Sequence, residues 1–198
     1  ATNGTLLKQG PDVLTLDLTQ GLGIDPQAML AGADRARQQL LLAATIDNVT
    51  HNDATGELSF RVQNQTGHKL ISGFPEGRRM FVNIKAYAGG NLIYEVNPYD
   101  DGVGTLKGLT NALSSPPLGP NEAYVDELVY ETHPSSSLTG EEESLHFVLS
   151  DDRYKDNRIP PKGFRISEAG DRLVQPRWHG ADATDYFTAA EYAGGYDD

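Results

Sequence analysis

The 198-residue sequence contains no cysteine. The chain therefore has no disulfide, no thiolate zinc site and no C-x-x-C-H motif for covalent haem attachment. It also lacks an apolar run of 18 residues, so we expect no transmembrane helix. No charged, then apolar, leader segment stands at residue 1, and for an exported protein we expect the signal peptide to have been removed.

Basic residues are scarce, with 16 lysines and arginines against 28 aspartates and glutamates, which gives a net charge of −12. This balance argues against a nucleic-acid-binding protein, because phosphates require a basic surface. It suits a soluble extracellular or cell-surface protein, or one that binds cations. The 21 glycines and 11 prolines indicate many turns.

The sequence predicts one domain over residues 1–198, mainly β, with an antiparallel β-sandwich and one N-terminal α-helix. Residues 1–25 are expected to form an irregular arm. Asp25-Pro26 is a typical helix start, and apolar residues at helical spacing predict a helix over 26–45. After a polar turn region from Asp47 to Gly56, residues 57–198 are expected to be β-rich. Strands are predicted over 58–62, 80–86, 92–96, 125–131 and 145–149, and apolar and polar residues alternate in the first two. A charged turn region is expected over 151–163.

The segment NQTGHKLISGFPEGRRM, Asn64 to Met80, concentrates chemically active side chains in one loop between strands. His68 could ligate a metal if its other ring nitrogen were held by a carbonyl or carboxylate. Alternatively, His68 simply hydrogen-bonds the loop. His133 is the second candidate, His146 is expected to be a structural residue on a strand, and the remaining histidines, at 51 and 179, are expected to be solvated.

Arg78 and Arg79 are expected on opposite faces of a strand, with at least one of them in a buried or half-buried ion pair. Two acidic turns offer oxygen ligands that calcium could use, although neither fits a helix-loop-helix calcium motif. The candidate ligands there are Asp100, Asp101, Asp151 and Asp152. These residues are also ordinary turn formers. No nucleophile motif or nucleotide-binding motif is present, so we expect a non-enzyme.

The T-G-H-K-L and P-E-G-R-R pieces of this loop resemble a segment in the non-haem, β-rich region of extracellular multihaem c-type cytochromes. The segments YETH (130–133) and LHFVLSDDRYKDNRIPPKGF (145–164) and the acidic, tyrosine-rich C-terminus are also similar to that family. The resemblance covers roughly residues 26–198. It departs from the family pattern because the loop proline is absent and no haem-attachment motif exists.

The resemblance implies that His68 serves as an axial haem ligand, with Lys69, Arg78 and Arg79 near propionates or acids. Any haem c must then come from a partner cytochrome chain or from a cleaved remainder of the same precursor. The first hypothesis is therefore a non-catalytic β-sandwich subunit or fragment of an extracellular electron-transfer assembly. The alternative is a stand-alone exported structural or adhesive protein, calcium-stabilised and polymeric.

Overall fold

The computed structural model describes residues 23, 25–109, 115–164 and 175–182. The chain divides into two compact units, Ala1–Leu42 and Ala43–Asp198. The predicted arm, the acidic, tyrosine-rich C-terminus and residues 165–174 lie wholly or almost wholly outside the described residues. The predicted single domain over 1–198 stays a prediction.

In the first unit, helix α1 (Pro26–Leu41) begins where the sequence predicts. The Asp25 carboxylate accepts a hydrogen bond from the Gln27 amide at 2.9 Å, and Pro26 occupies the first turn, where no backbone donor is needed. The helix ends at Leu41, four residues before the predicted end, because Thr45 already belongs to a strand and faces Gln63. None of the described helices is long and apolar enough to cross a membrane.

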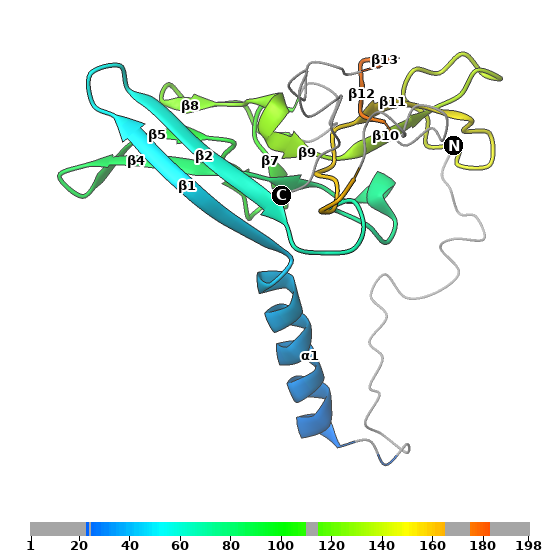
Figure 1. Ribbon diagram of the computed structural model, residues 1–198, viewed down its shortest axis with the longest axis horizontal. Coiled ribbons are helices and arrows are strands. Elements are labelled where there is room, and N and C mark those ends of the chain that lie inside the picture. The colour runs from blue at the N-terminus through cyan, green and yellow to red at the C-terminus, as the bar shows by residue number, and fades with distance from the viewer. Residues whose placement is uncertain (1–22, 24, 110–114, 165–174, 183–198) are drawn as a thin grey trace. The chain divides into compact units, whose positions relative to one another are not determined.

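The second unit opens with a hairpin of β1 (Ala44–Asn52) and β2 (Glu57–Asn64) (Figure 1). The prediction of β2 is confirmed, but that of a polar turn from Asp47 is wrong. Asp47 lies within β1 and forms a cross-strand ion pair with Arg61 at 2.9 Å. The actual turn is only four residues long, and Gly56 closes it with a left-handed φ of 75°.

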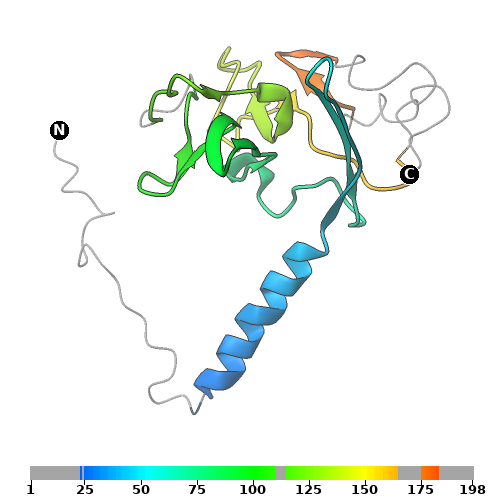
Figure 2. The ribbon, with the colours of Figure 1, turned by 90° about the vertical axis from the view of Figure 1, so that its left-hand side faces the viewer.

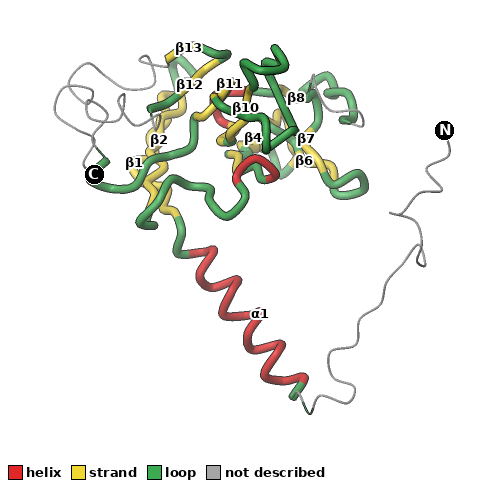
Figure 3. The backbone as a smooth tube through the Cα atoms, turned by 90° about the vertical axis from the view of Figure 1, so that its right-hand side faces the viewer, coloured by secondary structure: helices red, strands yellow, loops and turns green. Residues whose placement is uncertain are grey.

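Short strands make up the rest of the second unit (Figures 2 and 3). The pairing is antiparallel except between β5 and β8. The elements are β3 (Met80–Phe81) with β9 (Val129–Tyr130); β4 (Ile84–Ala88), β5 (Asn91–Val96) and β8 (Glu122–Ala123); β6 (Tyr99–Asp100) with β7 (Thr105–Leu106); and β10 (Thr132–Ser135), β11 (Asp152–Asp156), β12 (Arg177–Trp178) and β13 (Ala181–Asp182). Two 3-10 turns, η2 (Pro75–Gly77) and η3 (Asp126–Leu128), precede β3 and β9.

The predicted class, mainly β with antiparallel sheets and one α-helix, is confirmed, although the sheets are small and not closed. Further local predictions are wrong. The predicted strand over 125–131 is interrupted by η3, and only β9 forms a strand there. The segment 145–149 forms turns rather than a strand, and Val148 is 97% exposed because no neighbouring strand covers it. The expected charged turn over 151–163 instead contains β11, which pairs with β10.

The centre of the second unit is unusually polar. Among the described residues, only four large apolar side chains are buried: Leu70, Leu106, Val129 and Ile159. Ten polar or charged residues are buried beside them, including Glu131, Lys155 and Asp156. Because an unpaired buried charge is strongly unfavourable, such a centre requires internal ion pairs. These pairs form the sites described next.

Candidate functional site

The loop that carries His68 is anchored at its base. Leu70 exchanges two backbone hydrogen bonds with Ile159, at 2.8 and 3.0 Å. The Asn64 amide donates to the carbonyls of His68 and Ile159, at 2.7 and 3.0 Å. Arg158 donates to the carbonyl of Ile71 at 3.3 Å. The backbone around His68 is therefore held although its side chain is not buried.

His68 is exposed, and its two ring nitrogens have different surroundings. Nδ1 lies 3.1 Å from the Lys69 carbonyl and 3.2 Å from the Thr66 hydroxyl. Nε2 lies 3.4 Å from the Ser72 hydroxyl. Because the Lys69 carbonyl can only accept, Nδ1 carries the proton and Nε2 keeps its lone pair. This tautomer is the one that a metal-ligating imidazole requires.

Lys69 points the opposite way, into the protein. Its Nζ donates to the buried Asp156 carboxylate at 3.0 Å. Arg153 and Arg158 donate to the same carboxylate, at 2.8 and 2.9 Å. Burial alone would raise the pKa of Asp156, but these cationic donors outweigh it and lower the pKa to about 2. Burial also lowers the pKa of Lys69, and Asp156 partly offsets this effect.

Arg78 and Phe74 lie on the exposed side of the loop. Arg78 donates to the Ser72 carbonyl at 3.4 Å and has no ion-pair partner among the described residues. Phe74 is 56% exposed, has a left-handed φ of 66°, and meets the Phe147 ring edge-on at 5.2 Å. Such a backbone conformation is uncommon for a bulky residue. An imidazole, a guanidinium and an aromatic ring are thus all exposed on the same loop.

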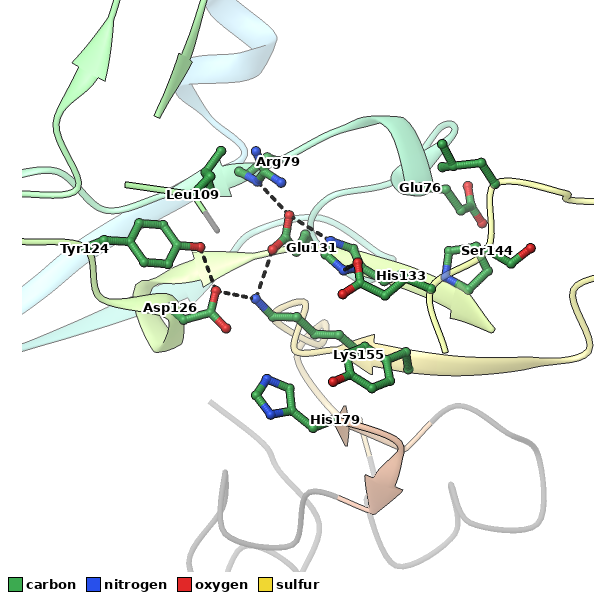
Figure 4. Close-up of a pocket in the computed structure, with 14 residues that line it drawn as sticks. Glu76, Arg79, Leu109, Tyr124, Asp126, Glu131, His133, Ser144, Lys155 and His179 are labelled. Atoms are coloured by element: carbon green, nitrogen blue, oxygen red, sulfur yellow. Dashed lines mark hydrogen bonds and ion pairs between the residues drawn. The ribbon is translucent and has the colours of Figure 1, made fainter. Parts of the chain in front are cut away.

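Arg79 points into a second site, which we call the Glu131 cavity (Figure 4). Its Nε donates to Glu131 at 2.6 Å, which confirms the predicted ion pair. Lys155, from β11, donates to both Glu131 and Asp126 at 2.9 Å. Tyr124 donates to Asp126 at 2.7 Å. The cavity has a volume of about 720 Å³, and its wall also includes Glu76, Leu109, His133, Pro134, Glu143, Ser144, Leu145, Tyr154 and His179.

The charges in this cavity shift one another's titration. Burial alone would raise the pKa of Glu131, but the hydrogen bond from His133 and the neighbouring cations outweigh it and lower the pKa to about 2. Burial raises the pKa of Tyr124, and its hydrogen bond to Asp126 raises it further. At neutral pH, Glu131 is ionised and Tyr124 is a hydrogen-bond donor.

The other histidines lie in different settings. His133 is half-buried, with Nε2 3.1 Å from Glu131 and Nδ1 2.9 Å from Glu143, so carboxylates face both nitrogens. This geometry leaves no ring nitrogen of His133 directed at a metal. His146, expected on a strand, lies exposed in a turn near Glu141. His51 is exposed beside Asp53, whereas His179 stacks between Tyr154 and Trp178.

The four aspartates predicted as calcium ligands do not converge. The Asp100 carboxylate accepts from the amides of Gly102 and Val103, an ordinary turn, and Asp101 is exposed next to it. Asp151 accepts from Ser137, and Asp152 pairs with Arg177 at 3.0 Å. Within the described part of the chain, no three or more side chains of the metal-ligating types lie close enough to hold an ion.

The Glu131 cavity was not predicted from the sequence. Glu131, Lys155 and Asp126 are ordinary charged residues in short segments that only the fold brings together. Their one visible signal is the alternation Lys155-Asp156, which places successive charges on opposite faces of β11. Comparison with protein-family models, with curated proteins and with solved structures gave no match.

Proposed function

We propose that the chain is a non-catalytic β-rich subunit or fragment of an extracellular, or cell-surface, electron-transfer assembly. In this proposal it contacts a haem c that a partner multihaem cytochrome chain, or a cleaved remainder of the same precursor, carries. The haem supplies the electron transfer, and this chain supplies an axial nitrogen and a protein wall. The observation that carries the proposal is His68: it is exposed, its Nδ1 is held by the Lys69 carbonyl, and its Nε2 meets only the Ser72 hydroxyl, at the long distance of 3.4 Å.

Two neighbouring features support the same surface. Arg78 offers an exposed guanidinium for a propionate, and Phe74 offers an apolar ring for a porphyrin edge. Lys69, in contrast, is buried and paired with Asp156, and Arg79 lines the Glu131 cavity, so we assign neither of them to a propionate. His133 has both nitrogens engaged, so we assign no ligand role to it.

The exposed apolar side chains support a subunit that packs against another protein. Ile46 and Val49 on β1 and Leu92 and Ile93 on β5 are each about half exposed or more. A soluble monomer rarely leaves so much apolar surface uncovered on its strands. The same observation favours the polymerisation in our second proposal, a stand-alone exported structural or adhesive protein that polymerises and binds calcium.

The haem proposal is tested by titrating the protein into a haem c peptide that has one open axial position. We expect the Soret band to shift to that of a six-coordinate, bis-histidine haem. His68→Ala should abolish the shift, and His51→Ala, an exposed histidine on β1, should not. An unchanged shift with His68→Ala would refute the ligand role.

The second proposal makes different demands. Calcium should then raise the melting temperature, EDTA should lower it, and sedimentation should show a homo-polymer. A colourless, monomeric protein with no response to EDTA and no Soret shift would reject both proposals.

A further inference from the structure

The Glu131 cavity is a second candidate binding site, separate from His68. None of its lining residues belongs to the 66–74 part of the loop. Its volume of about 720 Å³ falls within the range of pockets that hold small molecules. Glu131 and Lys155 on its floor are almost completely buried, at 5% and 3% side-chain exposure.

The buried charges in the floor satisfy one another. Lys155 bridges Glu131 and Asp126, and Tyr124 bonds the same aspartate. The hydrogen-bonded network fixes these side chains in place, so they form a scaffold. A ligand must therefore be recognised by the wall residues that still have unused hydrogen-bonding capacity.

Among the wall residues with that capacity, two carry opposite charges, Arg79 and Glu76. The guanidinium of Arg79 uses only Nε, toward Glu131, and both Nη groups have no hydrogen-bond partner among the described residues. Glu76, three residues earlier on η2, has no ion-pair partner within the described part of the chain. The wall thus offers a forked donor for a carboxylate and a carboxylate for an ammonium group.

An aromatic stack stands on another side of the cavity. The rings of Tyr154 and His179 are parallel, with centroids 5.4 Å apart, and Trp178 stacks on His179 at 4.8 Å. Tyr154 and His179 both line the cavity. This stack supplies a flat apolar surface beside the charged groups, suited to a side chain.

We propose that the Glu131 cavity binds a free α-amino acid, whose carboxylate meets Arg79, whose ammonium group meets Glu76, and whose side chain lies against the Tyr154–His179 stack. A simple cation would leave Arg79 without a charged partner, and a simple anion would leave Glu76 without one. A neutral polyol would leave both residues without a charged partner. A zwitterion can pair with both residues at once. An amino acid also leaves room in the cavity for ordered water.

The test is an NMR titration of the whole chain with the twenty standard amino acids, first pooled and then singly. Ethylamine, acetate and glucose serve as comparators that carry the ammonium group alone, the carboxylate alone, and neither charge. We expect saturable shifts of the Glu76, Arg79 and Tyr154 signals with at least one amino acid, and binding at least about tenfold tighter than any comparator.

Two substitutions at the wall should each weaken this binding by about tenfold. Glu76→Gln removes the ammonium partner. Arg79→Lys keeps a cation for Glu131 but loses the fork. Glu57→Gln, on β2 outside the cavity, is the matched control and should bind as the wild type does.

Each contrary outcome has a defined meaning. The absence of saturable binding by all twenty amino acids, or equal binding by Glu76→Gln and Glu57→Gln, overturns the proposal. Binding of ethylamine or glucose as tight as that of the best amino acid also overturns it, in favour of a cation site or a polyol site. His68→Ala should leave the amino-acid titration unchanged, so this test is independent of the haem titration.

Discussion

Two buried carboxylates, one next to β10 and one on the neighbouring strand β11, are each surrounded by three basic side chains, yet the two clusters are built differently. Glu131, just before β10, is held by Arg79, Lys155 and His133. Asp156, at the end of β11, is held by three other basic residues, Lys69, Arg153 and Arg158. In both, the cations lower the carboxyl pKa to about 2 against the effect of burial.

The two clusters differ in whether their basic residues contact further carboxylates. Lys155 also bonds Asp126, and His133 also bonds Glu143, so the Glu131 cluster contains spare acids. In the described part of the chain, Asp156 is the only carboxylate that its three cations contact. The Glu131 cluster is therefore a network that borders a cavity, whereas the Asp156 cluster is a single anchor beneath the His68 loop.

The largest expected effect is that of Asp156→Asn. It leaves three largely buried cations without a carboxylate, and breaking a buried pair in this way costs about 3–5 kcal/mol of unfolding free energy. Urea denaturation of the variant and the wild type measures the loss. Asp53→Asn, whose side chain is 99% exposed, should change stability very little. A loss for Asp156→Asn no larger than that control would contradict the anchor role.

Glu131→Gln should cost less, about 2–3 kcal/mol, because Asp126 still pairs with Lys155 and Glu143 still bonds His133. The same denaturation experiment measures it, with exposed Glu127→Gln as the control. The order of the two losses of unfolding free energy tests the comparison more directly than either loss alone. If Glu131→Gln proved more damaging than Asp156→Asn, spare acids would not explain the difference between the clusters.

Acid should weaken both clusters, and the sign follows from the lowered pKa values. A carboxyl whose pKa is lower in the folded state stabilises the fold above its unfolded pKa, and this contribution disappears as the pH falls toward the folded value. For Glu131 the window runs from 4.5 to about 2, and for Asp156 from 3.8 to about 2. Circular dichroism during acid titration should show stability falling through these windows.

The variants separate the two contributions to acid sensitivity. Glu131→Gln should delay the onset of the loss toward pH 3.8, because the group with the higher unfolded pKa is gone. Asp156→Asn should leave the onset near pH 4.5 but flatten the curve below 3.8. Identical pH profiles for the two variants and the wild type would show that these carboxyls do not control acid stability.

The contrast between the clusters also shows how far the sequence could be interpreted. Strand β2, strand β5 and the start of α1 follow from local patterns: alternation, the preceding Gly89-Gly90 turn, and the Asp25-Pro26 cap, respectively. An ion pair for at least one of Arg78 and Arg79 was also predictable, and the structure shows that Arg79 forms it. Its partner, 52 residues away, was not.

The failures have a common cause. The segment 145–149 is mostly apolar, as many strands are, but it pairs with no strand, and Val148 is left exposed. Conversely, the charged sequence around Lys155 was expected to be a turn, yet it forms β11 because its charges are neutralised across the fold. Rules that place polar residues outside cannot anticipate a centre built from ion pairs.

A smaller effect on stability is expected at Gly77, in the turn η2. A Cβ at Gly77 would overlap the Phe74 ring, so Gly77→Ala must displace that exposed ring and disrupt its contact with Phe147. We expect a loss of about 1 kcal/mol, in the range of a single aromatic pair. Aromatic NMR shifts of Phe147 report the displacement. Gly67→Ala, where a Cβ meets nothing within 4 Å, is the control.

The smallest effect on stability should come from His68→Ala. Its ring is exposed and its hydrogen bonds go to its own loop, so the change in unfolding free energy should stay within about 0.5 kcal/mol. The same variant should remove the Soret shift completely. Asp156→Asn should do the reverse, with a large loss of unfolding free energy. In molecules that still fold, it should weaken the Soret shift only in part, because the Nε2 atom of His68 is still present although its loop has lost an anchor. Equal losses of stability for His68→Ala and Asp156→Asn would contradict the prediction that the exposed tip of the loop contributes little to stability and that its buried base contributes much.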